Sequence, residues 1–176
     1  RRPPAIALSP PLALQLGAAL PVAAVGASPT AGYENGSTPL NLTQIARYTS
    51  GQFNVDGGVM EIVAYNQANG FAYAINGQSG QLAAIPLNDL AAGTAVAQLS
   101  GTDIDVKALV EAADSSFRYG DMTSVAMSQD NTTLAAALQA EGYNDAGRVA
   151  LFTCNGDGSL TLKGLVETGV QPDMVT

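Results

Sequence analysis

The chain has 176 residues, a net charge of −8 and only 12% charged side chains. This acidic balance excludes a surface made for nucleic acid or for anionic lipid. Histidine is absent and Cys154 is the only cysteine, which excludes within this chain a Ser-His-Asp triad, a histidine zinc site and an intrachain disulfide. The 19 glycines favour an all-β fold with many tight turns over a helical one.

The start of the chain has the layout of a secretory signal peptide. Arg1 and Arg2 precede a run rich in Ala, Leu, Val and Pro, and Val25-Gly-Ala27 supplies the small residues of a cleavage site. Prolines in the run argue against a transmembrane helix, so we expect no membrane span in the mature part. We interpret residues 1–27 as a signal peptide with a truncated front, residues 28–40 as a linker, and the protein as secreted or cell-surface. An uncleaved anchor or a disordered tail is the alternative.

We predict that residues 41–176 form the folded domain, in which short apolar strands alternate with turns rich in Asn and Gly. After a first strand at residues 44–48, a meander of four antiparallel strands is expected, and Asn69-Gly70 is a strong hairpin signal. Such a meander is typical of one blade of a β-propeller. The four expected strands are residues 59–65, 71–75, 81–87 and 95–99.

A short helix and a second meander follow. The spacing of apolar residues predicts the helix at residues 103–113, with Thr102 or Asp103 as its cap. The alanine-rich run at residues 134–140 has helical propensity, yet its counterpart in the first meander reads as a strand, so we predict a strand here too. The four strands of the second meander are expected at residues 122–128, 132–139, 147–154 and 159–166.

The two meanders form an internal repeat. Val63 and Val125 are 62 residues apart, as are Asn69 and Asn131, and Pro172-Asp-Met-Val-Thr176 opens the pattern a third time. We therefore predict an all-β fold: a partial β-propeller of about two four-stranded antiparallel blades, the start of a third blade and one short inserted helix. This interpretation makes residues 41–176 the N-terminal part of a propeller domain. Because two blades leave sheet edges unpaired, we expect residues 40–176 alone to be poorly soluble or loosely folded.

Several motifs, taken in order, resemble the choice-of-anchor I family. They are Glu61-Ile-Val-Ala-Tyr, Thr123-Ser-Val-Ala-Met, Gly147-Arg-Val-Ala-Leu-Phe and Val170-Gln-Pro-Asp-Met-Val-Thr176. The resemblance covers about residues 40–176 and implies a bacterial β-propeller protein, secreted or surface-anchored and related to mesenchyme-specific cell-surface glycoproteins. It implies a propeller longer than this chain, and it implies no defined activity.

Three polar residues stand at or beside the first strand of each repeat: Glu61, Ser124 and Asp173. Because such strand starts line the channel of a propeller, Ser124 is a candidate channel-lining residue. Glu61 and Asp173 are candidate oxygen ligands for Ca²⁺ or Mg²⁺. The alternative is that these side chains hold neighbouring blades together through hydrogen bonds to the backbone.

The other polar and aromatic motifs favour structural roles. Asn155-Gly-Asp157-Gly-Ser159 predicts a tight turn, because it lacks the later bidentate Glu of a calcium loop. Cys154 is expected to be a buried, inert thiol. Four aromatic side chains are interpreted as packing residues rather than sugar platforms: Tyr65, Phe71, Tyr73 and Tyr143.

The predicted function is a binding module rather than an enzyme. We expect its partner to be an extracellular protein or carbohydrate and not nucleic acid, because the charge is negative and no catalytic constellation is present. The alternative is a metal-dependent hydrolase, phosphoesterase-like or lactonase-like, that uses acidic residues at the inner-strand starts.

Overall fold

A computed structural model describes residues 43–55, 58–88, 90 and 96–176. The chain divides into two units, residues 1–43 and 44–176, and the helices and strands of the described part all belong to the second. The predicted signal peptide and linker, together with Asp56, Gly57 and Ala95, lie outside the described residues.

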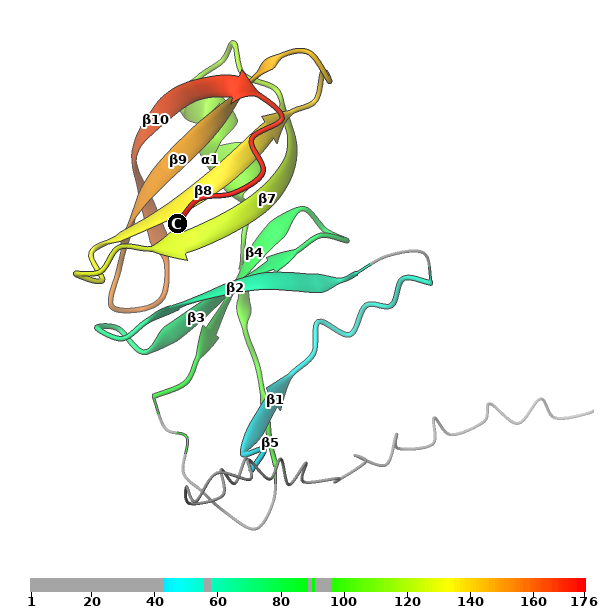
Figure 1. Cartoon of the computed structure of the whole chain (residues 1–176). Helices are drawn as coiled ribbons and strands as arrows, with labels where there is room; N and C mark the ends of the chain where they lie inside the picture. The colour runs from blue at the N-terminus through cyan, green and yellow to red at the C-terminus, as the bar shows by residue number, and fades with distance from the viewer. Residues whose placement is uncertain (1–42, 56–57, 89, 91–95) are drawn as a thin grey trace, which may run out of the picture. The chain divides into compact units, whose positions relative to one another are not determined.

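Two four-stranded antiparallel sheets dominate the second unit, which confirms the predicted fold class (Figure 1). The first sheet, called blade 1, has the strand order β2-β3-β4-β6. Its strands are β2 (Met60–Asn66), β3 (Phe71–Asn76), β4 (Gln81–Pro86) and β6 (Thr102–Ile104). The second sheet, blade 2, is a simple meander of β7 (Tyr119–Met127), β8 (Thr133–Ala140), β9 (Ala146–Cys154) and β10 (Leu160–Val170). β7 packs beside β2 and β3, so the two blades are neighbours in space as well as in sequence.

The fourth strand of blade 1 corrects the prediction. The segment expected there forms β5 (Ala97–Leu99), which instead pairs in parallel with β1 (Ala46–Tyr48) in a separate two-stranded sheet. β6 takes the place beside β4, with Leu82 opposite Ile104. The side chain of Ile104 packs against the core between the blades, whereas Ala97 and Gln98 of β5 are exposed. Burial of Ile104 therefore favours β6 over β5 at this edge.

The helix α1 (Val106–Ala113) begins three residues later than predicted. Its cap is Asp105, whose carboxylate accepts a hydrogen bond of 2.9 Å from the backbone N–H of Ala108. Thr102 and Asp103, the expected caps, are instead engaged in the pairing of β6 with β4. Val106 and Val110 are fully buried, so the helix is held by one apolar face.

Two hairpin turns of blade 1 share one design. The Asn66 side-chain oxygen accepts hydrogen bonds from the backbone N–H groups two and three residues later, at 2.9 and 3.2 Å. Asn76 does the same at 3.2 and 3.2 Å. Each turn closes with a glycine at positive φ, Gly70 at 74° and Gly80 at 68°, which is the conformation that glycine adopts without strain. The predicted hairpin is therefore confirmed, although Asn66 and not Asn69 leads it.

Asparagine side chains also join the turns of the two blades. Asn66, which is 1% exposed, donates to the backbone oxygen of Asn131 at 3.0 Å. The side-chain oxygen of Asn131 accepts from the N–H of Gln67 at 2.9 Å, and Asn69 donates to the backbone oxygen of Asn155 at 2.9 Å. Because buried amides are costly to leave unpaired, these bonds fix the register of one blade on the other.

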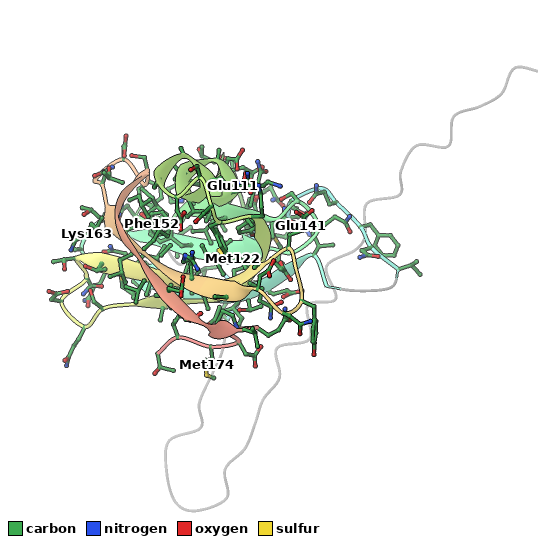
Figure 2. All side chains as sticks on the ribbon, turned by 90° about the horizontal axis from the view of Figure 1, so that it is seen from above. Glu111, Met122, Glu141, Phe152, Lys163 and Met174 are labelled. Carbon is green, nitrogen blue, oxygen red and sulfur yellow. The ribbon has the colours of Figure 1, made fainter. Side chains whose placement is uncertain are left out.

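The main hydrophobic core lies between the facing sides of the blades. Met122 and Phe152 lie inside this layer, whereas Met174 stands at its outside (Figure 2). The largest fully buried apolar side chains are Tyr73, Ile75, Leu82, Val106, Val110, Met122, Leu134, Leu138 and Phe152. A smaller cluster of Ala72, Ala74, Ala83 and Ile85 lies on the other side of blade 1, where Tyr48 and Leu99 pack against it.

Candidate functional site

An open cleft of about 570 Å³ lies where blade 1, α1 and the start of β7 meet. Its walls are the β3–β4 turn (residues 77–81), Asp105 and Lys107 at the start of α1, and residues 119–121 of β7. These three segments are far apart in sequence. The fold therefore assembles a polar surface that no single motif contains.

Tyr119 holds the cleft together. Its hydroxyl donates a hydrogen bond of 3.0 Å to the backbone oxygen of Gly80, which joins β7 to the β3–β4 turn. Its backbone N–H donates to the carboxylate of Glu111 on α1 at 2.9 Å. The three walls are therefore braced by one residue that is only 5% exposed.

Two carboxylates dominate the electrostatics of the cleft. Burial raises the pKa of the Tyr119 hydroxyl, and the negative charges of Asp121 and then Asp105 raise it further. One oxygen of Asp121 accepts from the N–H of Met122 at 2.8 Å, and one oxygen of Asp105 caps α1. Among the described residues the second oxygen of each makes no hydrogen bond within the chain. Lys107 lies 4.0 Å from Glu111, so its charge is partly matched along the helix. The cleft is thus acidic and rich in hydrogen-bond acceptors.

The predicted metal ligands lie in two different surroundings. Glu61 is exposed on β2, and its Oε1 lies 3.1 Å from the point where a Cβ on Gly77 would stand, so it lies beside one wall of the cleft. Asp173 is exposed in the segment after β10. The described residues contain no group of three or more His, Cys, Asp or Glu side chains able to hold a metal ion. Binding of Ca²⁺ or Mg²⁺ by Glu61 and Asp173 stays a prediction.

Ser124 joins β7 to the segment that follows β10. Its hydroxyl, in a residue only 2% exposed, accepts from the N–H of Val175 at 3.2 Å. The neighbouring Thr123 hydroxyl donates to the backbone oxygen of Pro172 at 2.8 Å. Residues 172–176 therefore lie along β7, in the red segment that runs back over blade 2 (Figure 1). The role of Ser124 as a channel-lining residue stays a prediction.

A bulge recurs at the same point of both repeats. The pairing of β2 with β3 shifts between Met60 and Val63, and that of β7 with β8 shifts between Met122 and Ser124. A bulge leaves backbone groups without a ladder partner and re-aims the side chain beside it. In blade 2 the re-aimed side chains are the two hydroxyls that bind residues 172–176.

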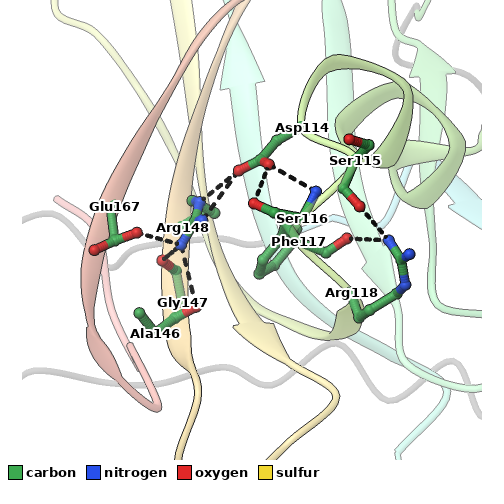
Figure 3. A network of polar contacts seen from close by, with 9 residues as sticks. All are labelled: Asp114, Ser115, Ser116, Phe117, Arg118, Ala146, Gly147, Arg148 and Glu167. Carbon is green, nitrogen blue, oxygen red and sulfur yellow. Dashed lines mark hydrogen bonds and ion pairs between the residues drawn. The ribbon is translucent and has the colours of Figure 1, made fainter.

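An arginine network that the sequence did not predict lies at the C-terminal end of α1 (Figure 3). The Arg148 guanidinium binds Asp114 at 3.0 and 3.2 Å, binds Glu167 at 3.2 Å, and lies 5.1 Å from the centre of the Phe117 ring. It also donates to the backbone oxygens of the two preceding residues. The one signal in the sequence is a charged residue within the apolar run of β9. Because Arg148 on β9 binds Asp114 at the end of α1 and Glu167 on β10, the network fastens α1 to these two strands.

We expect the folded domain to lose stability in acid, because folding lowers the pKa of two carboxyls, Asp114 and Asp130. Hydrogen bonds from Ser116 and then Arg148 lower the pKa of Asp114 from 3.8 to about 2. Bonds from Ser128 and Thr132 lower that of Asp130 from 3.8 to about 2. Both carboxyls are less basic when folded, so their stabilisation is complete above about pH 4 and is lost as the pH falls toward 2.

We expect the melting temperature to fall across this pH window, and the double variant Asp114→Asn, Asp130→Asn to flatten the fall. The measurement is a series of thermal melts by circular dichroism. An equally steep fall in the double variant would show that other carboxyls control acid stability.

Several smaller predictions can be compared with the structure. Asp157 accepts from the backbone and the hydroxyl of Ser159 at 3.0 and 2.7 Å, which confirms the predicted turn. Tyr73 is fully buried, as expected of a packing residue, whereas Tyr65 and Tyr143 are 50% and 75% exposed. Cys154 is half-buried and not fully buried, because it stands at the end of β9.

Among the described residues no helix is long and apolar enough to cross a bilayer. Comparison with protein families matches residues 61–176, more than half of the chain, to the model of the Choice-of-anchor I domain. Neither the curated proteins nor the solved structures contain a match.

Proposed function

The chain belongs to the choice-of-anchor I domain family, and from that premise we propose that it is a non-catalytic binding module for an extracellular carbohydrate. Family membership makes it a β-rich protein of the cell surface or the extracellular space. The proposed binding site is the cleft between blade 1, α1 and β7.

The chemistry of the cleft walls carries the proposal. Asp105 and Asp121 offer carboxylate oxygens, Gln78 and Gln81 offer amides, and Ser79 offers a hydroxyl. Sugar hydroxyls both donate and accept hydrogen bonds, so they suit a wall of carboxylates and amides better than an apolar molecule does. Pockets for apolar ligands are lined mainly by hydrophobic side chains, which this cleft lacks.

The charge of the cleft selects among carbohydrates. Asp105 and Asp121 attract an amino sugar and accept neutral hydroxyls, whereas they repel the carboxylate of a uronic acid. The ligand class is therefore a neutral or amino-sugar polysaccharide. The exposed, shallow form of the site suits one or two sugar units of a longer chain rather than a small molecule enclosed on all sides.

The test measures oligosaccharide binding by isothermal titration calorimetry on the whole chain, with neutral, amino and acidic oligosaccharides. We expect Asp121→Asn to weaken binding of the neutral or amino form by about 10-fold to 100-fold, since a charged hydrogen bond contributes roughly 1.5–3 kcal/mol. The amide oxygen of asparagine can still accept from the N–H of Met122, so the fold should be preserved.

The matched control is Asp157→Asn, the same chemical change at an exposed turn of blade 2. It should leave affinity unchanged. The proposal is wrong if no member of the panel binds, or if the two variants weaken binding equally.

A further inference from the structure

We propose that the turn between β9 and β10 is a site of spontaneous deamidation at Asn155, and that the isoaspartate formed there weakens the contact between the blades. Asn-Gly occurs four times in the sequence, and three of these pairs lie among the described residues: Asn69-Gly70, Asn76-Gly77 and Asn155-Gly156. The structure distinguishes the three, because hydrogen bonds hold two of them closed. The turn lies outside the cleft, so the inference does not depend on the proposed function.

The reaction requires the backbone nitrogen of the glycine to reach the side chain of the asparagine. This nitrogen loses its proton and forms a bond to the side-chain Cγ. The bond between Cγ and Nδ2 then breaks, and ammonia leaves with the proton. Water opens the resulting five-membered imide ring at either carbonyl, which gives aspartate or isoaspartate. Glycine favours the ring closure, because it has no Cβ and its backbone adopts conformations closed to other residues.

The two Asn-Gly pairs of blade 1 are protected by the fold. Their glycine N–H groups donate to the backbone oxygens of Asn66 and Val59, each at 2.9 Å. The side-chain amide of Asn69 makes hydrogen bonds to three groups, and Asn76 is only 2% exposed. Each of these turns must therefore open before the glycine nitrogen can react, and opening costs free energy.

The pair in blade 2 is open at both reacting groups. Gly156 is exposed, and its N–H has no hydrogen-bond partner among the described residues. Asn155 is half-buried, and its Nδ2 donates to two exposed hydroxyls, those of Ser159 at 3.0 Å and Thr161 at 3.1 Å. Water replaces such surface hydrogen bonds at little net cost, so the amide can turn toward the nitrogen of Gly156.

The turn that carries this pair also joins the blades. The backbone oxygen of Asn155 accepts from the side chain of Asn69 at 2.9 Å and from the N–H of Gly158 at 3.1 Å. Isoaspartate adds one atom to the main chain and converts this carbonyl into a carboxylate outside the backbone. The change displaces the acceptor of Asn69, so the hydrogen bond between the blades is weakened.

The test follows the whole chain during long incubation in mildly alkaline buffer. Proteolytic digestion and mass spectrometry measure deamidation at the three pairs in one sample. We expect conversion at Asn155 to be at least about tenfold faster than at Asn69 and Asn76, because opening either protected turn breaks hydrogen bonds. In concentrated urea the three rates should become comparable. Equal rates in the folded chain, or the same order in urea, would overturn the proposal.

Gly156→Ala is the matched variant. Among the described residues, a Cβ at this position meets no atom within 4 Å, and Gly156 is not one of the glycines at positive φ, so the fold should be kept. The added Cβ hinders ring closure, and we expect deamidation at Asn155 to slow by about tenfold. If the variant does not fold by circular dichroism, the comparison between the folded and the urea-unfolded wild type decides the site.

Thermal melts of incubated samples test the effect on the blades. The melting temperature of the wild type should fall as isoaspartate accumulates at Asn155, whereas that of Gly156→Ala should stay constant over the same time. A wild type that converts fully at Asn155 and melts as before would overturn the proposed weakening of the contact between the blades.

Discussion

Replacing Tyr73 with alanine is expected to lower the free energy of unfolding by about 3–5 kcal/mol, the cost of emptying a large aromatic site in a core. Tyr73 is fully buried between the two blades and lies 6.5 Å from the ring of Phe71. Loss of the ring leaves a cavity that both blades line, so neither blade alone can close it. Denaturation with urea, followed by circular dichroism, measures the change.

Tyr73→Phe is the matched control, because it keeps the ring and removes only the hydroxyl. That oxygen accepts from the side chain of Asn69 at 2.9 Å, and the same Asn69 nitrogen also donates to the backbone oxygen of Asn155. We expect a loss of about 1 kcal/mol, typical of one hydrogen bond. Burial raises the pKa of Tyr73 to about 12, so the hydroxyl is neutral throughout such measurements. Equal losses in the two variants would mean that the ring contributes little to the interface.

Replacing Arg148 with alanine is expected to lower the free energy of unfolding by about 2–4 kcal/mol. The arginine side chain is 11% exposed, and its removal ends the bonds to Asp114, Glu167 and two backbone oxygens at once. Its carboxylate partners are more exposed than the arginine, so water takes up part of their charge and keeps the loss below that of a fully buried pair.

The control for this substitution is Arg118→Ala. Arg118 is exposed and, among the described residues, donates only to the backbone oxygens of Ser115 and Phe117, so its loss should be below about 1 kcal/mol. Arg148→Lys should recover only part of the stability, since an ammonium group keeps the charge but lacks the fork that reaches several acceptors. Full recovery by lysine would show that charge alone is needed.

The similarity between the two meanders allowed most of the fold to be predicted from the sequence. Strand positions followed from apolar runs between turns, and the alanine-rich run at residues 134–140 was correctly placed in a strand because its counterpart was one. Burial of Leu134, Ala136 and Leu138 between the blades outweighs the low strand propensity of alanine. The partner of a strand was harder to predict. Nothing within residues 97–99 shows that they pair with β1, because register there depends on residues about 50 positions away.

The cleft was less predictable than the fold, for the same reason. Asp105 caps α1, but the sequence predicted Thr102 or Asp103 as the cap, and its neighbour across the cleft, Asp121, carries no motif. The two come together only because Tyr119 reaches Gly80 across 39 positions of the chain. Arg148 is likewise a charged residue within the apolar run of β9, and nothing in the sequence indicates that its partner is Asp114, 34 positions earlier. Sites built from separate segments need the tertiary structure.

The asparagine bonds between the blades also constrain the order in which the chain assembles during synthesis. The Asn66 side chain is buried in the finished domain, yet its acceptor on Asn131 is 65 residues further along. Blade 1 leaves the ribosome first and, at that moment, holds an amide with no protein acceptor. Its turn must stay hydrated until β7 and β8 have been made, so the two blades complete their folding together and not one after the other.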